Sequence, residues 1–541
     1  MSLTNMHLEK YFPHKTPRPQ QVDAINFAID SFLSSDKKYV IIEAGTGVGK
    51  SAIGMTIAGM LGEHLSSSEE YSNGAWFVTT QKILQDQYIG DFGSLSLKSI
   101  KSSSNYKCRF KKRNSCSDSL NELRSIEKGT KFWNTCTFNC TYKNAKESFI
   151  ASKKSITNFP YFLTESSYSR KITPRNFLVI DEAHNVETEL SKFIEISVSE
   201  RFSKSTLKLV FPDIKTQHQA LQWVEDVYYP KLKSHLKHTE KILEKYKGLK
   251  DKLNEFTSLS KQLDLLSSHH KKLKRFLEIY DKDNWIFDAE DGYGRKGKRI
   301  FFKPIDISQY SDQLLFRFGE KILMMSATIL DKDSFCQTLG IPLDETEFIS
   351  LPSPFPRKNR PIFQVSIGSM SKNNIDNSLP KIAEAVKQIL EQHKNDKGII
   401  HAHSYKIANY IKKAVRSRRI LIHDSNNRDI ILKKHKESKT PTVLISPSMT
   451  EGVDLAGDCS RFQIICKVPY PFLGDKLIKK RMNKWRWWYP LQTAKTIMQS
   501  VGRSVRNRDD FAVTYILDSD WYYFYQKNGK FFPEDFKKCI K

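Results

Sequence analysis

A glycine-rich segment near the start of the chain has the residue types and spacing to hold a row of phosphates. Ala44 to Ser51 fit the P-loop pattern of a small residue, four variable positions and Gly-Lys-Ser. Glycines let the backbone curl until several N–H groups point at one anion. Lys50 would place a positive charge on the β- and γ-phosphates, and the Ser51 hydroxyl would ligate Mg²⁺. The predicted nucleotide contacts are Ala44, Gly45, Thr46, Gly47, Val48, Gly49, Lys50 and Ser51.

Two adjacent carboxylates could supply the remaining chemistry of phosphate hydrolysis. Asp181-Glu182-Ala-His184 ends an apolar run that begins at Phe177. Asp181 can hold Mg²⁺ through water, and Glu182 can orient and deprotonate the water that attacks a γ-phosphate. Many strands end in acidic residues, but the tetrapeptide Asp-Glu-Ala-His downstream of a P-loop is a specific signal of phosphate hydrolysis.

A third group of polar residues lies near the C-terminus. Gln499, Gly502, Arg503 and Arg506 have the spacing i, i+3, i+4 and i+7, which puts them on one face of a helix. Such a face can meet a γ-phosphate bound on another domain, as an arginine finger does. A solvated basic helix is the alternative. The predicted catalytic residues are Lys50, Asp181, Glu182, Gln499, Arg503 and Arg506.

Four of the eight cysteines lie within 33 residues, with the spacing C-x7-C-x19-C-x3-C; they are Cys108, Cys116, Cys136 and Cys140. The segment is rich in Lys, Ser and Asn and has weak hydrophobic periodicity, so a metal centre would explain how it folds. Four thiolates suit Zn²⁺ or an iron–sulfur cluster. The C-x2-C pairs usual for zinc are missing, and chance clustering is the remaining alternative.

The overall charge indicates a polyanionic partner. The 541 residues carry a formal net charge of +27, which favours nucleic acid as a partner. The alternative is that the charge is dispersed over the surface and only keeps the protein soluble. The excess is concentrated in residues 101–154 and 467–508, the second of which also contains Trp485, Trp487, Trp488 and Tyr489. Aromatic side chains in a basic groove can stack on bases, although some of these must belong to the core. There is neither a long apolar run nor the apolar core of a signal peptide, so we expect a soluble, intracellular protein of the cytoplasm, nucleoid or nucleus, without membrane contact.

The elements that must position these groups form two α/β patterns. Strands are predicted over residues 39–42, 75–80, 177–181, 299–304 and 321–326, and a helical insertion over residues 193–283. The residues 351–361 contain four prolines and predict a linker. Beyond it, strands over 398–401 and 442–446 begin a second pattern. Gln21, which precedes the P-loop at the start of a helix, could hydrogen-bond an adenine edge or simply be exposed.

In their order along the chain, these segments resemble a superfamily 2 helicase, and more narrowly the XPD/DinG family of iron–sulfur DNA helicases. The resemblance covers nearly the whole chain. The segments that carry it are residues 44–51, Thr79-Thr80-Gln81, the four cysteines, 140–147, 157–163, Asp181-Glu-Ala-His184, Ser326-Ala-Thr328, Glu451-Gly-Val-Asp454 and 499–506.

The resemblance implies an α/β fold with two RecA-like P-loop domains, each a parallel sheet flanked by helices. The first would contain a small [4Fe–4S] cluster domain and a helical arch. It further implies that Gln21 and Asp454 bind the nucleotide and that the ligands of the cluster are the four cysteines, with Ser51 and Asp181 holding Mg²⁺. The expected division is 1–98, 156–192 and 299–356 for the first motor, 99–155 for the cluster domain, 193–298 for the arch and 357–541 for the second motor.

The function that follows is an ATP-dependent DNA helicase, expected to be monomeric. It would move 5′→3′ on single-stranded DNA, unwind forked duplex DNA, and serve repair, recombination or replication. An RNA-directed or non-unwinding ATPase is the second hypothesis. A nucleic-acid-binding scaffold with inactive ATPase motifs is the third, against which the intact Lys50, Asp181, Glu182 and arginine pair argue.

Overall fold

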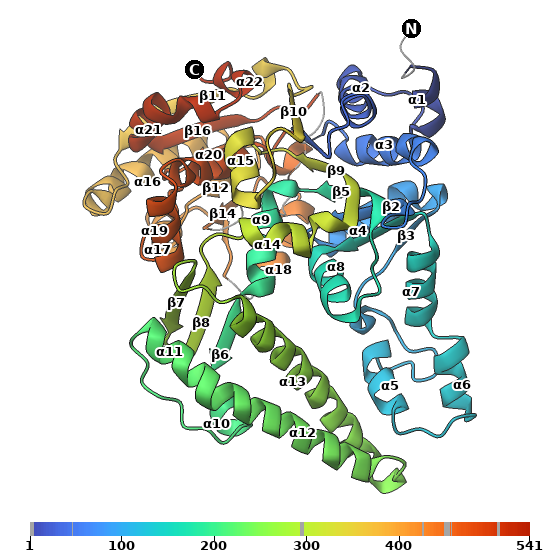
Figure 1. Cartoon of the computed structure of the whole chain (residues 1–541). Helices are drawn as coiled ribbons and strands as arrows, with labels where there is room; N and C mark the ends of the chain where they lie inside the picture. Colours follow the sequence, from blue (N-terminus) through green and yellow to red (C-terminus); the bar gives the residue numbers. More distant parts are fainter. Residues whose placement is uncertain are drawn as a thin grey trace.

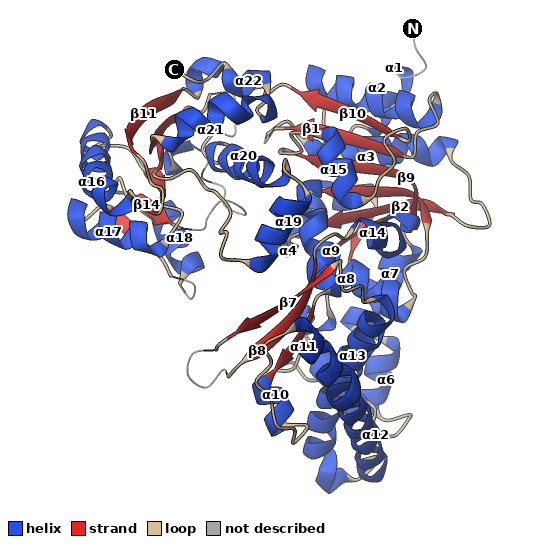
Figure 2. Cartoon of the chain, turned by 60° about the vertical axis from the view of Figure 1, so that its left-hand side comes forward, coloured by secondary structure: helices blue, strands red, loops and turns tan. Residues whose placement is uncertain are grey.

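The computed structural model describes residues 5–45, 47–292, 297–424, 427–447, 455, 457–505 and 509–541. These residues form two parallel sheets flanked by helices, which we call the first unit and the second unit, and a smaller antiparallel sheet (Figures 1 and 2). The α/β fold with two parallel sheets agrees with the prediction.

The first unit is built on a seven-stranded sheet of order β10-β1-β9-β5-β2-β4-β3, in which every pairing is parallel. Its central strands read as apolar runs because both faces are covered. On β1, Val40 and Ile42 belong to the core on one face and Ile41 to the core on the other. The strands are β1 (Tyr39–Ala44), β2 (Ser72–Thr79), β3 (Leu97–Ser99), β4 (Lys154–Asn158), β5 (Arg175–Asp181), β9 (Gly319–Ser326) and β10 (Thr346–Leu351).

Helices cover both faces of this sheet. The helix α3, which follows the P-loop, packs especially close: a Cβ added at Gly54 would lie 2.8 Å from the Cε atom of Met325 on β9. The small residue therefore lets the helix approach the sheet beneath the candidate phosphate site. The helices are α1 (Asn5–Tyr11), α2 (Pro19–Leu33), α3 (Lys50–His64), α4 (Lys82–Phe92), α8 (Phe159–Thr164), α9 (Val186–Ile194), α14 (Ser308–Leu314) and α15 (Lys332–Leu339).

Two excursions leave the first unit. The cysteine segment runs from β3 to β4 and contains α5 (Cys116–Leu123), α6 (Lys131–Phe138) and α7 (Thr141–Ala151). The second excursion, which we call the arch, runs from β6 to β8 between β5 and β9. Its elements are β6 (Ile196–Ser199), α10 (Glu200–Ser205), α11 (Gln217–Trp223), α12 (Tyr229–Tyr246), α13 (Leu253–Ile279), β7 (Trp285–Glu290) and β8 (Arg299–Pro304).

The arch is not purely helical. The strands β6, β8 and β7 form an antiparallel sheet at its base, which the prediction of a helical insertion missed. From this base the long helices α12 and α13 project away from the first unit, toward the cysteine segment (Figure 1). The end of α13 that is far from the base contacts α5: Ser260 Oγ donates to Asn121 Oδ1 at 3.0 Å, and Lys261 pairs with Asp118 at 2.6 Å. The two excursions thus touch.

The second unit is a six-stranded parallel sheet of order β11-β16-β15-β12-β14-β13 with helices on both faces (Figure 2). Its strands are β11 (Ile362–Gly368), β12 (Gly398–His401), β13 (Ile420–Ile422), β14 (Val443–Ser446), β15 (Phe462–Ile465) and β16 (Val513–Asp518). Its helices are α16 (Ile375–Gln392), α17 (Tyr405–Val415), α18 (Arg428–Glu437), α19 (Lys476–Lys484), α20 (Trp488–Val501), α21 (Asp520–Asn528) and α22 (Glu534–Lys537). Within the described part of the chain, no helix combines the length and apolarity that crossing a membrane requires.

Candidate nucleotide site between two units

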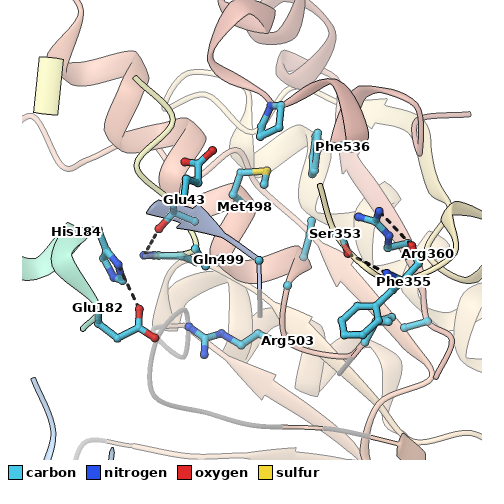
Figure 3. A pocket seen from close by; sticks show the side chains of 18 of the residues that line it. Glu43, Glu182, His184, Ser353, Phe355, Arg360, Met498, Gln499, Arg503 and Phe536 are labelled. Carbon is cyan, nitrogen blue, oxygen red and sulfur yellow. Dashed lines mark hydrogen bonds and ion pairs between the residues drawn. The ribbon is translucent and has the colours of Figure 1, made fainter. Parts of the chain in front are cut away.

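A cavity of about 970 Å³ lies between the two units (Figure 3). The first unit lines it at the carboxyl ends of its strands, where parallel sheets commonly bind ligands. The second unit closes it from the opposite side. The lining residues that carry polar groups include Glu43, Thr80, Gln81, Glu182, His184 and Thr328 from the first unit and Gln463, Gln499 and Arg503 from the second.

The predicted P-loop lies where β1 ends and α3 begins. Gly47 and Gly49 have φ angles of 83° and 87°, which only glycine adopts readily. Lys50 Nζ donates to the carbonyl oxygen of Ala44 at 3.2 Å, which folds the lysine back over the loop. Gly45 lines the cavity. The backbone is thus curled as an anion-binding loop requires. Of the predicted nucleotide contacts, Thr46 lies outside the described residues.

Gln21 supports the P-loop from one side. Its amide oxygen accepts the Arg18 backbone N–H at 2.8 Å, and its amide nitrogen lies 3.5 Å from the Gly49 carbonyl oxygen. The side chain is buried and does not line the cavity. The Arg18 side chain also holds the P-loop, because its guanidinium donates to the Gly47 carbonyl oxygen. Contact between Gln21 and an adenine base stays a prediction.

The two carboxylates follow the last residues of β5. Asp181 is buried, and its Oδ1 accepts the backbone N–H of Glu182 at 2.9 Å. Burial and the neighbouring Glu182 raise the pKa of Asp181 to about 6, while Lys50 opposes the shift. Glu182 has a φ of 55°, a left-handed conformation that is uncommon outside glycine. This turn directs its side chain into the cavity (Figure 3).

His184 ties this turn to the end of β9. Its Nδ1 is 2.8 Å from Ser326 Oγ and 3.4 Å from Glu182 Oε2. Its Nε2 is 3.0 Å from the amide of Asn185. The predicted segments Asp181-Glu-Ala-His184 and Ser326-Ala-Thr328 therefore meet through a single imidazole.

From the second unit, Gln499 reaches across the cavity. Its Nε2 is 3.4 Å from Thr328 Oγ1, so the two units are joined next to His184 and Ser326. Arg503 also lines the cavity, and Figure 3 shows its guanidinium directed toward Glu182 from the opposite unit.

The prediction of one continuous helix from Gln499 to Arg506 is wrong. The helix α20 ends at Val501, and Gly502 caps it. The helix ends here because glycine is a poor helix former. Two residues further on, the Ser504 side chain is held by a 2.8 Å hydrogen bond to Ser460. Gln499, Gly502 and Arg503 still line one cavity, but a helix end and the loop after it bring them there. The structure does not describe two further predicted site residues, Asp454 and Arg506.

Glu43 was missed by the sequence analysis. It is buried at the end of β1, where its carboxylate accepts the Leu330 N–H at 2.5 Å and the Ser350 hydroxyl at 2.8 Å. Burial raises the pKa of Glu43, while its hydrogen bonds from Leu330 and Ser350 and, to a smaller extent, the positive charge of Lys495 on α20 oppose the shift. A carboxylate in an otherwise apolar strand is the signal that could have revealed it.

The end of the cavity formed by the linker and the C-terminal segment is more apolar. Phe355 and Phe536 are buried and line it. Between them, the guanidinium of Arg360 pairs with Asp535 and donates to the Phe355 carbonyl oxygen at 3.4 Å. The cavity therefore has a polar end and an aromatic end (Figure 3).

Comparison with known protein families finds matches in two separate parts of the chain. Residues 14–211 match the family described as type III restriction enzyme, res subunit. Residues 386–538 match the helicase C-terminal domain family. The two matches fall largely on the first and second units respectively.

Several curated proteins are similar over part of the chain. It is 26% identical over 256 residues to the ATP-dependent DNA helicase DinG of Photobacterium profundum, covering 43% of this chain and 36% of that protein. It is 25% identical over 230 residues to the ATP-dependent DNA helicase YoaA of Escherichia coli, covering 40% and 36%. It is 21% identical over 490 residues to the ATP-dependent DNA helicase CHL1 of Debaryomyces hansenii, covering 74% and 59%. The chain thus spans little more than a third of the first two relatives.

Solved structures show the same fold over nearly the whole length. An XPD helicase superposes with a TM-score of 0.64 at 17% identity, covering 96% of this chain and 98% of that chain. Xpd4 of S. tokodaii gives 0.58 at 15% identity, covering 97% and 99%. The chain therefore has the fold of the XPD helicases over nearly its whole length, and parts of it are similar in sequence to DinG and CHL1. The first and second units are accordingly its two RecA-like domains.

The four cysteines of the segment between β3 and β4 converge. Cys108, Cys116, Cys136 and Cys140 are buried and line one small cavity, and the sulfur atoms of Cys116 and Cys140 are 3.9 Å apart. Burial and the nearby thiols raise the pKa of Cys136 to about 12. A cation would hold such thiols deprotonated. In the described ranges, no group of three or more His, Cys, Asp or Glu side chains is arranged for a metal ion. In number, burial and convergence, the four thiols fit a metal centre or cluster that is ligated by thiolates. Their spacing in the sequence does not specify which group this is.

The helix α19 docks the second unit onto the first. Arg481 is buried and forms a 2.7 Å ion pair with Glu187 on α9, and its Nε donates to the Ile305 carbonyl oxygen at 2.8 Å. Lys484 pairs with Asp306 at 2.6 Å. Two basic residues of the segment predicted to bind a polyanion, Arg481 and Lys484, therefore hold the two units together.

The aromatic residues beside α19 are mainly packing residues. Trp485 and Trp488 are buried, and Trp487 stacks on Trp485 with ring centroids 5.8 Å apart. Tyr489 stacks on Tyr470 at 5.8 Å. Of the aromatic residues considered for base stacking, Trp485 and Trp488 are therefore core residues.

Proposed function

We propose that this chain is an ATP-dependent DNA helicase that moves 5′→3′ on single-stranded DNA and unwinds forked duplexes. The observation that carries the proposal is the single cavity that joins the P-loop and the Asp-Glu-Ala-His turn of one RecA-like domain to Gln499 and Arg503 of the other. Relatives named as ATP-dependent DNA helicases support DNA as the polymer. The polarity and the role in repair, recombination or replication rest on the family resemblance.

Predicted catalytic and metal-binding residues that the structure describes have defined tasks in this proposal, although Lys50, Ser51 and Asp181 are not among the residues that line the cavity. Lys50 binds the β- and γ-phosphates, while Ser51 and Asp181 hold Mg²⁺. The metal neutralises charge on the phosphate oxygens. Glu182 orients the attacking water and takes its proton, and Arg503 stabilises the charge that develops on the γ-phosphate. Closure of the two units completes the site, and their reopening after hydrolysis moves one unit along the DNA relative to the other.

The aromatic end of the cavity offers a place for the base. Phe355 and Phe536 provide apolar surface, and Arg360 provides donors. The same cavity contains Gly45 of the P-loop, so one nucleotide could reach from one end to the other. The proposed domain division is that of residues 1–98, 156–192 and 299–356 for the first motor, with 99–155 and 193–298 as excursions and 357–541 as the second motor. Within it, β8 at residues 299–304 pairs with β6 and β7 and therefore belongs to the arch.

Replacing Lys50 by alanine tests the nucleotide site. We expect DNA-stimulated ATP hydrolysis to fall by roughly 100-fold or more, because a fixed positive charge on the phosphates is lost. Binding to single-stranded DNA should persist, since it depends on other basic residues. Release of phosphate and fluorescence anisotropy of labelled DNA measure the two properties. The exposed Lys387 on α16 supplies a control, Lys387→Ala, expected to retain both. Undiminished hydrolysis in Lys50→Ala would refute the site.

Strand-displacement assays distinguish the alternative functions. DNA and RNA forks with a 5′ or a 3′ tail should show unwinding only of DNA with a 5′ tail. Unwinding of RNA would favour the RNA-directed enzyme, and ATP hydrolysis without displacement would favour a non-unwinding ATPase. Failure to hydrolyse ATP with any nucleic acid would favour the scaffold.

We further propose that the four converging cysteines hold a [4Fe–4S] cluster. Protein purified without oxygen should contain about four iron and four sulfide per chain. Cys136→Ser should lose most of this iron, because one of four thiolates is removed. The matched variant Cys336→Ser replaces a buried thiol of the first unit outside the segment and should keep it. Zinc without iron or sulfide in the unmodified protein would contradict the cluster.

A further inference from the structure

A tyrosine hydroxyl reaches the candidate metal site from α4. The Oη atom of Tyr88 donates to Asp181 Oδ2 at 2.9 Å, and both residues are buried. The hydroxyl of Ser51 also interacts with this phenol. Tyr88 therefore lies beside both of the residues to which the proposed function assigns Mg²⁺.

The contacts of Asp181 show what this hydroxyl does. Oδ1 accepts the backbone N–H of Glu182, and Oδ2 accepts the phenol of Tyr88. Each carboxylate oxygen can accept two hydrogen bonds or ligand contacts, so one site on each oxygen is left for a metal-bound water. With both oxygens held, the carboxylate cannot rotate freely.

The ring of Tyr88 is itself fixed. It packs against Phe77 and Phe92, with ring centroids 6.1 Å and 5.7 Å away. Phenylalanine would fill the same space, so packing alone does not require the hydroxyl. The hydroxyl instead satisfies a buried carboxylate that has lost water.

The position of α4 links this contact to the cavity. Leu84 and Gln87 of the same helix line the space between the two units, while Tyr88 points to Asp181. One helix thus faces the cavity and the metal-binding carboxylate at once.

We propose that Tyr88 is a positioning residue that sets the orientation of Asp181 for the Mg²⁺–nucleotide complex. The inference rests on the proposed nucleotide site and adds a residue to which no role has been given. Outer-shell partners of this kind typically change metal affinity or activity by about 10- to 100-fold.

The test is Tyr88→Phe, which removes the hydroxyl and keeps the ring. A fluorescent ATP analogue is titrated with MgCl₂ in the absence of DNA. We expect the Mg²⁺ concentration at half-maximal binding to rise roughly 10-fold, with nucleotide binding in EDTA unchanged. In ATP hydrolysis, the KM for Mg²⁺ should rise while kcat at saturating Mg²⁺ changes much less.

Tyr161→Phe is the matched control. Tyr161 is another buried tyrosine of the first unit, whose hydroxyl lies 3.2 Å from that of Tyr142. It should leave the Mg²⁺ dependence unchanged. Thermal unfolding of all variants shows whether Tyr88→Phe is folded.

A double-mutant cycle shows whether Tyr88 acts through Asp181. Adding Tyr88→Phe to Asp181→Asn should change the Mg²⁺ dependence of binding no further than Asp181→Asn alone. Equal Mg²⁺ dependence in the unmodified protein and Tyr88→Phe would overturn the inference, as would fully additive effects in the cycle. Absence of nucleotide binding by the unmodified protein would instead refute the proposed function.

Discussion

Arg503→Ala should reduce the kcat of DNA-stimulated ATP hydrolysis by roughly 1,000-fold while leaving nucleotide binding largely intact. Arg503 lines the cavity from the second unit and is directed toward Glu182 of the first. A guanidinium in that place stabilises charge that develops only in the transition state, so its loss lowers kcat more than affinity. Single-turnover hydrolysis and binding of a fluorescent nucleotide measure the two effects separately.

Two further variants sharpen this experiment. Arg503→Lys keeps the charge but loses the planar donors, so it should recover only part of the rate. Arg418→Ala removes an exposed arginine of the second unit that does not line the cavity, and it should behave as the unmodified protein. A kcat within about tenfold of normal in Arg503→Ala would exclude an arginine-finger role for this residue.

Arg481→Met should lower the apparent free energy of unfolding by roughly 3 kcal/mol. The side chains of Arg481 and Glu187 are only 9% and 15% exposed, so removing one partner leaves a carboxylate with little access to water. The double variant Arg481→Met with Glu187→Met should recover much of the loss, because the unpaired charge is then gone. Thermal and urea unfolding, followed by two probes because the protein has two units, measure the changes.

An exposed pair supplies the control for Arg481. Lys406 and Asp376 pair at 2.6 Å, with 59% and 78% of their side chains exposed. Lys406→Met should have little effect because solvent screens such a pair. If Arg481→Met were no more destabilising than Lys406→Met, the docking of α19 would not depend on the buried charge pair.

The half of the site that belongs to the first unit could be predicted from the sequence because it depends on neighbours along the chain. The strand predicted over residues 39–42 is β1, and the one predicted over 177–181 is β5. In both, an apolar run reveals the strand and the next few residues contain the chemistry. Lys50 and Glu182 therefore lie in the elements that local sequence assigned to them.

Other features of the molecule depend on partners that are distant in the sequence. Ser197 of β6 pairs with Phe301 of β8, so a four-residue strand is formed only by a partner more than a hundred residues away. Arg481 was counted as part of a basic cluster because Glu187, which determines its role, is nearly 300 residues away. Tyr88 gave no signal either, since a buried hydroxyl and a core ring look identical until Asp181 is placed beside them.

The order of strands in the first sheet has a consequence for the ancestry of the molecule. The cysteine segment leaves after β3 and returns on β4, which is its neighbour in the sheet, and the arch leaves after β5 and returns before β9, again its neighbour. Each excursion could therefore have been inserted into a gene for a plain two-domain protein by a single recombination event, because neither insertion changes the order of strands in the sheet.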